Sequence, residues 1–411
     1  MRIGKLSKID MTNDLNGLAE KIWSKLSHFE KELIEFRRHF HQFPELSWKE
    51  FRTAERITSL LKGDGYVVNT GICKTGVVAE FIGSEGGKTI AIRSDMDALP
   101  MYDAKDVPYA SRIPGVMHAC GHDVHMALVI GVAKILKRLN VHVPGKVRLI
   151  FQPSEEASPS GAEELVRAGV MEGVDSVFAF HVDPEIQTGK IGLREGIMTA
   201  HCDEFKLTIQ GRSGHAARPH HTIDTIYLSN QILSALYDIA GNRTHSFVPA
   251  VLTVGRMDGG TKSNVIPERV DIQGTVRTID EETRKEIIAA IEQRVQALTR
   301  AAGGRYQLEF SSPIPPVIND SNLLNLVRTV GVHALSSDGV VDIKDVSMGG
   351  EDFSWYLKKA PGVLIRLGVR RESEDIKYLH TNTFDVDERA IAIGTAVMTM
   401  VVLKYFDLVI Q

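Results

Sequence analysis

The chain has 411 residues, a formal net charge of −4, 43% hydrophobic residues and 24% charged residues. This composition excludes disordered, collagenous and disulfide-scaffold proteins, and the length predicts two domains, one inserted into the other. No run of lysine and arginine is long enough to form a nucleic-acid-binding arm, so a nucleic-acid partner is not predicted.

Cysteine usage and apolar runs bear on the compartment. Cys73, Cys120 and Cys202 cannot all pair within one chain, which favours a reducing, cytoplasmic location. The segment MRIGKLSKIDMTND carries charges and lacks the apolar core of a secretory signal. The apolar stretch at 390–403 is shorter than the roughly 18 residues that a membrane span needs. It predicts a buried helix and no membrane association.

The first part of the chain predicts alternating helices and strands. Apolar and charged residues recur at helical spacing from about residue 15 to residue 43, and a second helix is predicted at 48–61. Short β-branched runs then predict strands at 77–81, 89–92, 146–151 and 176–180, with an apolar helix at 124–136. Near-continuous apolar strands that alternate with helices predict an α/β domain with a mainly parallel sheet.

The pattern changes after about residue 198. It predicts strand 204–209, helix 223–239, strands 251–254 and 270–276, helix 281–299 and strand 306–310. This β-α-β-β-α-β order is the ferredoxin-like arrangement. From residue 312 onward helices and short strands resume, with an apolar strand at 363–367. We therefore predict a first domain formed by 1–198 and 312–411, and an inserted α+β domain at 199–311.

Several common motifs are absent. GSEGGKT (83–89) lacks the glycine that a phosphate loop requires five positions before Gly87, and no G-x-G-x-x-G opens a helix. GRSGH (211–215) does not match the nucleophile elbow of serine hydrolases, and H-E-x-x-H does not occur. These absences argue against the usual nucleotide-binding, serine-hydrolase and zinc-protease signatures.

A possible metal-binding turn lies at 117–123, in the sequence MHACGHD. Cys120 and His122 flank Gly121, and a glycine lets the backbone turn sharply enough for both side chains to converge on one ion. Thiolate and neutral imidazole both bind first-row divalent metals. The structural alternative is a helix start with a buried cysteine and incidental histidines, and this turn by itself does not decide between them.

Three further places carry ligand-type residues after apolar segments. Glu155 and Glu156 follow the strand 146–151, where two carboxylates are costly unless something neutralises them. One carboxylate could bind a metal while the other takes a proton from water. His181 follows the strand 176–180, and His380 lies in a late loop. Each has a structural alternative, but together they predict a site with two neighbouring metals.

With these segments in view, the chain resembles the dinuclear metal amidohydrolases and carboxypeptidases that include aminoacylases, hippurate hydrolases and auxin-conjugate hydrolases. The matching segments run in one order over nearly the whole chain: FRRHFHQFPELSWKE (36–50), RSDMDALP (93–100), VMHACGHDVH (116–125), FQPSEEASPSGAEELVRAGVM (151–171), GRSGHAARPH (211–220), TKSNVIPE (261–268), GGEDFSWY (349–356) and YLHTNTFDVDE (378–388). One departure is the loop PSEEASPSGA, where relatives more often have PAEE followed by glycines, and this leaves substrate preference open.

The resemblance implies a metal centre and its chemistry. It implies two divalent cations per subunit, with zinc, manganese, cobalt and nickel as candidates. The implied ligands are Cys120, His122, Glu156, His181 and His380. Glu155 corresponds to the general base, and Asp97 lies where relatives carry an orienting carboxylate.

The resemblance also implies a zinc-peptidase-like catalytic domain with a ferredoxin-like lid through which homodimers, or higher oligomers, form. In the lid, His215 corresponds to a histidine that contacts the scissile carbonyl, often from the partner subunit. Asn264 and Arg277 correspond to positions that hold the substrate carboxylate, and Gly350 to a further substrate-binding position. The structural alternatives are a surface histidine, a turn asparagine and a strand arginine.

The implied activity is hydrolysis of the amide bond of N-acyl L-amino acids by a metal-activated water. The nearest alternative is a carboxypeptidase or dipeptidase that acts on small peptides at the same site. A catalytically silent protein that binds amino-acid derivatives is a further alternative, against which the presence of Glu155 and every ligand position argues. A closed structural metal site is disfavoured because it seldom needs an adjacent spare carboxylate.

Overall fold

The computed structural model describes residues 8–84, 86–242 and 248–408, and the chain divides into two compact units. The first unit comprises Met1–Gly196, Ile318–Lys344 and Asp352–Gln411, and the second comprises Ile197–Val317 and Asp345–Glu351. The second unit is thus inserted into the sequence of the first.

The short segment 345–351 belongs to the second unit, although the sequence pattern predicts it in the first domain. Backbone hydrogen bonds explain this assignment. The amide of Ala200 donates to the carbonyl of Ser347 over 2.9 Å, and the amide of Ser347 donates to the carbonyl of Met198 over 3.1 Å. No periodic pattern in seven residues could have indicated these contacts.

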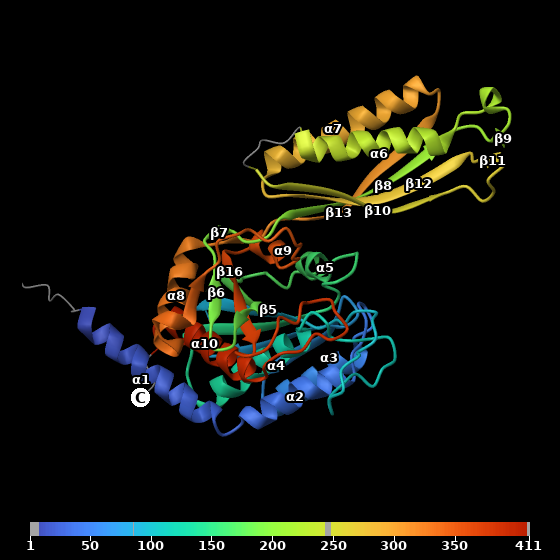
Figure 1. Ribbon diagram of the computed structural model, residues 1–411. Helices are drawn as coiled ribbons and strands as arrows, with labels where there is room; N and C mark the ends of the chain where they lie inside the picture. The colour runs from blue at the N-terminus through green and yellow to red at the C-terminus, as the bar shows by residue number, and fades with distance from the viewer. Residues whose placement is uncertain (1–7, 85, 243–247, 409–411) are drawn as a thin grey trace, which may run out of the picture. The chain divides into compact units, whose positions relative to one another are not determined.

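The first unit is built on a sheet whose described strands follow the order β1-β2-β4-β3-β5-β16-β6-β15 (Figure 1). Its strands are β1 (Val67–Ile72), β2 (Gly76–Ile82), β3 (Lys88–Asp95), β4 (Gly145–Gln152), β5 (Ser176–Gln187), β6 (Ile191–Leu193), β15 (Val340–Asp342) and β16 (Gly362–Arg370). The central pairs β3–β4, β3–β5 and β5–β16 are parallel, whereas β1–β2, β2–β4 and β6–β16 are antiparallel. The predicted α/β class with a mainly parallel sheet is confirmed.

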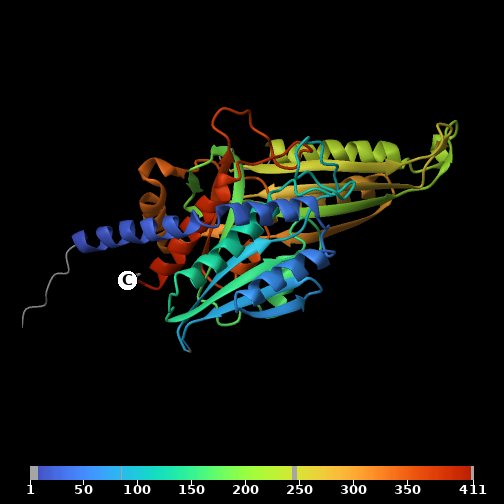
Figure 2. The same ribbon diagram turned by 90° about the horizontal axis from the view of Figure 1, so that it is seen from below.

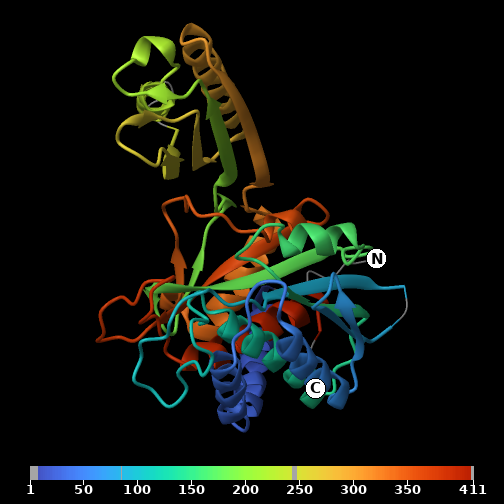
Figure 3. The ribbon, with the colours of Figure 1, turned by 90° about the vertical axis from the view of Figure 1, so that its right-hand side faces the viewer.

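Helices cover both faces of this sheet. They are α1 (Lys8–Leu26), α2 (Glu30–Gln42), α3 (Phe51–Gly63), α4 (His122–Arg138), α5 (Gly161–Arg167), α8 (Ser321–Leu335), α9 (Ser354–Leu357) and α10 (Arg389–Tyr405). Helices α4 and α10 pack together on one face, while α5 and α9 lie on the other (Figures 1 and 3). Figure 2 shows α1 against α10 on the α4 face. The stretch 390–403 is accordingly a buried helix, as predicted, because α10 has neighbours on several sides.

The helical region predicted at 15–43 is two helices, α1 and α2, separated at residues 27–29. The hydroxyl of Ser27 donates to the carbonyl of Ser24 over 2.8 Å, and Nδ1 of His28 donates to the same carbonyl over 2.7 Å. Such side-chain bonds compete with the helical ladder, and the break allows Phe29 to be buried.

Within the described ranges, no helix is both long and apolar enough to cross a bilayer.

The second unit has a four-stranded antiparallel sheet in the order β10-β12-β8-β13. Its elements are β8 (His201–Gln210), β9 (Gly214–His215), α6 (Thr225–Asn242), β10 (Ala250–Gly259), β11 (Val265–Ile266), β12 (Arg269–Thr278), α7 (Glu281–Ala301) and β13 (Arg305–Ile314). Helices α6 and α7 lie side by side on one face of the sheet (Figure 1) and enclose a core that includes Leu207, Ile232 and Ile291. This confirms the ferredoxin-like insert.

The remaining described elements are short: β7 (Gly196–Ile197), β14 (Ile318–Asn319) and 3₁₀ turns at Pro219–His221 and Ser337–Gly339.

Candidate metal centre

The turn before α4 carries Cys120 and His122 on either side of Gly121. Gly121 has a φ of 83°, and a Cβ atom at this position would lie 2.4 Å from Cγ2 of Val182. Both the backbone angle and the close approach of Val182 therefore require glycine. The turn places Sγ of Cys120 3.5 Å from Nε2 of His181 on β5.

We expect Gly121→Ala to lower the free energy of unfolding by roughly 2–5 kcal/mol, because a left-handed backbone angle and an overpacked contact add. Urea unfolding of the metal-free protein measures this. Gly17→Ala is the matched control, because nothing lies within 4 Å of a Cβ atom at this position in α1. It should be neutral or stabilise by about 0.5–1 kcal/mol. Equal effects of the two substitutions would contradict the assigned role of Gly121.

Hydrogen bonds orient two of the candidate imidazoles. Nδ1 of His122 donates to the carbonyl of Asp97 over 2.8 Å, and Nδ1 of His181 donates to the carbonyl of Val182 over 2.8 Å. With the proton held on Nδ1, the Nε2 atom of each ring is left as the metal-binding nitrogen. Such a bond from the second ring nitrogen is the usual way in which proteins fix a histidine ligand.

The carboxylate of Asp97 fixes the acidic loop that follows β4. Oδ1 accepts from the amide of Glu155 and Oδ2 from the amide of Glu156, each over 3.0 Å, and the Ser47 hydroxyl donates to Oδ2 over 2.7 Å. A second buried carboxylate, that of Glu50, accepts from the amide of Ser154 over 2.9 Å. Asp97 therefore orients the backbone of both glutamates and contacts His122 through its own carbonyl.

A backbone hydrogen bond joins the loop that carries His380 to the turn before α4, which carries Cys120. The amide of His380 donates to the carbonyl of Ala119 over 2.9 Å, and the residue has a positive φ of 58°. Its Nε2 lies 3.1 Å from Oε1 of Glu156, and the interaction with this carboxylate raises the pKa of His380 above its ordinary value. His380 is thus brought beside Cys120 and Glu156 although it lies far along the chain.

In the described part of the chain, the predicted ligands and Glu155 form three overlapping groups among themselves, and within each group the candidate ligand atoms lie within 4.8 Å of one another. The groups are Cys120–His122–His181, Cys120–Glu156–His380 and His122–Glu155–Glu156. Because the groups share members, they form one continuous cluster of thiol, imidazole and carboxylate. This donor set suits first-row divalent cations.

Electrostatics support the fit of a cation to this cluster. Burial raises the pKa of the Cys120 thiol well above its usual value, and Glu156 adds to the effect, so a thiolate here needs a compensating positive charge. Burial alone would lower the pKa of His122, but Asp95 raises it well above the ordinary value. Nε2 of His122 is buried and has no hydrogen-bond partner. A divalent cation would supply both the missing charge and the missing partner.

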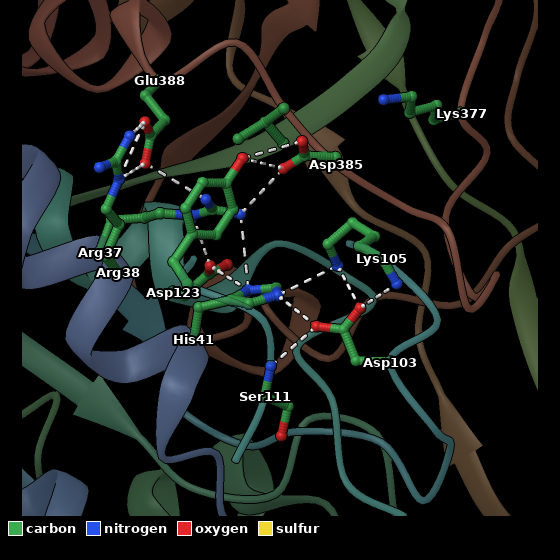
Figure 4. Close-up of polar contacts among 12 residues, drawn as sticks. Arg37, Arg38, His41, Asp103, Lys105, Ser111, Asp123, Lys377, Asp385 and Glu388 are labelled. Carbon is green, nitrogen blue, oxygen red and sulfur yellow. Dashed lines mark hydrogen bonds and ion pairs between the residues drawn. The ribbon is translucent and has the colours of Figure 1, made fainter. Parts of the chain in front are cut away.

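A buried ionic network supports the helix that begins with His122 (Figure 4). Nε of Arg37 and Nδ1 of His41, both on α2, each lie 2.7 Å from Oδ2 of Asp123. Arg37 also lies 3.5 Å from Asp385 and 3.3 Å from Glu388. Burial alone would raise the pKa of Asp123, but Arg37 and His41 hold it well below its usual range. The network therefore links α2 to the start of α4 and to the segment before α10.

A second buried network surrounds Arg93, and its role was not predicted from the sequence. This side chain donates to Asp95 over 2.7 Å and to Asp352 and Gln152 over 2.8 Å each. Ser160 also donates to Asp352, over 2.7 Å, so the acidic loop is anchored at both ends. In the sequence, this network is indicated only by the charged residues that follow the apolar strand at 89–92.

The four candidate residues of the second unit lie in two places. The main-chain carbonyl of Asn264 accepts a hydrogen bond from the amide of Ala216, the residue after His215. Both His215 and Asn264 are exposed. Arg277 instead donates to Sγ of Cys202 over 3.0 Å, and a Cβ atom at Gly350 would lie 3.0 Å from the same sulfur.

These two places lie at opposite ends of the sheet in the second unit. The turn that carries His215 follows β8, and the amide of Gly211 donates to Glu268 just before β12 begins at Arg269. Arg277 lies near the other end of β12, and at the rise per residue of a strand it is about 26 Å from Arg269. The structure thus pairs His215 with Asn264 and Arg277 with Gly350.

The first unit combines a sheet with a parallel centre and a cluster of thiol, imidazole and carboxylate groups. A ferredoxin-like unit is inserted into it. This combination is typical of two-domain metallopeptidases. A family model described as peptidase family M20/M25/M40 matches residues 91–404. The N-acetyl-L-cysteine deacetylase of Bacillus subtilis is 40% identical over 370 residues, which are 89% of this chain and 86% of that protein. Thermostable carboxypeptidase 2 of Saccharolobus solfataricus is 36% identical over 392 residues, covering 94% of this chain and 99% of that one.

A solved structure is similar to this chain over nearly its whole length. It is that of a Bacillus subtilis protein described as a dinuclear metal binding peptidase from the M20 family, with a TM-score of 0.79, 33% identity and coverage of 93% of this chain and 99% of that chain. The chain belongs to peptidase family M20/M25/M40. It is a metal-dependent amidohydrolase or carboxypeptidase that uses divalent cations.

Proposed function

We propose that the protein hydrolyses the amide bond of N-acyl L-amino acids, with N-acetyl groups as the typical acyl group. The observation that carries the proposal is the placement of Glu155 within 4.8 Å of the candidate ligand atoms of His122 and Glu156, with both glutamate amides fixed by Asp97. A relative that is 40% identical is named an N-acetyl-L-cysteine deacetylase, which supports this substrate class.

In the proposed reaction Cys120, His122, Glu156, His181 and His380 hold two divalent cations. When bound, these cations polarise the amide carbonyl and lower the pKa of the attacking water. Glu155 accepts the proton of that water and returns it to the leaving amine, the role of a general acid–base. Asp97 is a positioning residue, because it holds the backbone of Glu155 and leaves the carboxylate to act.

For the second unit, we propose that His215, which lies beside Asn264, contacts the scissile carbonyl of the substrate. We propose that Asn264 and Arg277 hold the substrate carboxylate, and that Gly350, beside Arg277, is a further substrate-binding residue. The separation of these pairs along β12 favours a homodimer in which each pair serves a different active site. The edge strand β10, with exposed Val251 and Met257, is the proposed dimer surface.

We also propose that the protein works in the cytoplasm, because Cys73, Cys120 and Cys202 are all unpaired. The metals we propose are zinc, manganese, cobalt or nickel, all of which accept this donor set.

Cleavage of small peptides by a carboxypeptidase or dipeptidase is the second candidate activity. It is favoured by the 36% identity to a protein named thermostable carboxypeptidase 2. The two activities would use the same cations and the same base, because both cleave an amide beside a free α-carboxylate. They differ in the group on the acyl side of the scissile bond.

The proposal is tested by mass-spectrometric assay of N-acetyl amino acids and of dipeptides, with zinc, manganese, cobalt or nickel added to protein stripped by a chelator. We expect release of acetate from N-acetyl amino acids with a higher kcat/KM than dipeptide cleavage, no turnover in the stripped protein, and recovery when a cation is restored. Higher kcat/KM for dipeptides would favour the carboxypeptidase. Turnover that survives removal of all cations would refute the proposed chemistry.

A further inference from the structure

His125 lies in the first turn of α4 and is 1% exposed. Its Nδ1 lies 2.6 Å from Oδ1 of Asp95, and its Nε2 lies 2.9 Å from the amide nitrogen of Val182. A backbone N–H only donates, so Nε2 is the acceptor and the ring proton is on Nδ1. His125 comes within 4.8 Å of ligand atoms of Asp95 and His122, but both of its nitrogens are already bonded.

Val182, whose amide donates to His125, lies next to the candidate ligand His181 and beside Gly121. It directly follows His181, and its carbonyl accepts the hydrogen bond from Nδ1 of His181. The pairing of β3 with β5 ends at Arg93 and Ala179, so β3 no longer flanks β5 at Val182. His125 binds the amide there, and the Val182 side chain packs against Gly121 in the cysteine turn.

We propose that His125 is a positioning residue that sets the distance between the turn carrying Cys120 and His122 and the strand carrying His181. The inference rests on the ligand set proposed above. His125 joins α4 to β5 by one hydrogen bond and α4 to β3 by another, so the separation of 3.5 Å between Cys120 and His181 depends on the imidazole that links these elements. Its role is the spacing of ligands, which is distinct from binding a cation.

Two substitutions separate the two bonds of His125. His125→Asn keeps an N–H donor near the position of Nδ1 for Asp95, but its side chain is too short to accept from Val182. His125→Gln carries an amide oxygen near the position of Nε2 and retains that acceptor. Cobalt(II) affinity is measured by chelator competition, and the thiolate-to-cobalt absorption reports the coordination of Cys120. Urea unfolding of each metal-free variant gives its stability.

We expect His125→Asn to weaken cobalt(II) binding by about 10–100-fold and to shift the thiolate-to-cobalt absorption, as loss of outer contacts does at other metal sites. His125→Gln should restore both readouts. Equal cobalt(II) affinity and an unchanged spectrum in His125→Asn, with only a loss of urea stability, would overturn the positioning role. A folded His125→Gln that binds cobalt(II) about 10–100-fold more weakly than the parent protein would overturn it too, whether or not His125→Asn folds.

His181→Ala distinguishes this inference from the ligand assignment. If it loses a bound cobalt(II) ion while His125→Asn behaves like the parent protein, the ligand set stands and the positioning role fails. If His181→Ala retains both ions at the parent affinity, the ligand set fails and the positioning role fails with it.

Discussion

Replacing Glu155 by glutamine is expected to lower kcat by about 10²–10⁴-fold, the usual contribution of a general acid–base group. Glutamine has nearly the shape of glutamate but cannot take a proton from water. The backbone amide at residue 155 still donates to Asp97, so the loop should keep its conformation. Metal content should therefore stay at the parent level, which elemental analysis measures alongside kcat.

Glu164→Gln is the matched control for this experiment. Glu164 lies on α5, is 33% exposed at its side chain and pairs with Arg167 at the surface. Its kcat should stay within about twofold of the parent, because surface ion pairs contribute little. A Glu155→Gln enzyme with near-parent kcat and full metal content would contradict the assignment of Glu155 as the base.

Replacing Arg37 by methionine is expected to lower the free energy of unfolding by about 3–5 kcal/mol, because it leaves a buried carboxylate without its charge partner. The side chain of Arg37 is 0% exposed and that of Asp123 is 1% exposed. Methionine fills similar volume, so the effect reports the lost charge and its hydrogen bonds. Urea unfolding of the metal-free protein, with the loss of helical circular dichroism as the signal, measures it.

The neighbouring arginine provides the control. Arg38 also contacts Glu388 and lies over the ring of Tyr109, but its side chain is 44% exposed. Arg38→Met should cost less than about 1 kcal/mol, since solvent screens an exposed ion pair. Similar losses for the two variants would mean that burial around Asp123 does not determine the strength of this network.

Local patterns predicted most of the architecture. The order β8, α6, β10, β12, α7, β13 followed from periodicity because each element alternates apolar and polar positions with its own period. The break at 27–29 was missed, since it depends on two side chains that bond the carbonyl of Ser24. Strand β1 was missed as well, because it is an edge strand with mostly exposed residues and lacks an apolar run.

The candidate site was predicted by residue type but not by contact. Cys120, His122, Glu155, Glu156, His181 and His380 were singled out because such residues at the ends of apolar segments suit a metal. Asp97 was expected to orient the metal site, and the structure adds that it binds the backbone amides of both glutamates. His125 and Arg37 gave no signal, because a polar residue on an apolar helix face looks the same whether or not it supports a ligand.

The fold class, the ferredoxin-like insert and the chemical types of the candidate ligands could be predicted from residue order, because they depend on periodicity and on which side chains bind metals. Which of these side chains meet follows from the packing of the folded chain. The β4 strand lies between β2 and β3 in the sheet, so the acidic loop after β4 reaches Asp97 after β3 although many residues separate them. Such proximity depends on strand order and packing, which local sequence patterns do not encode.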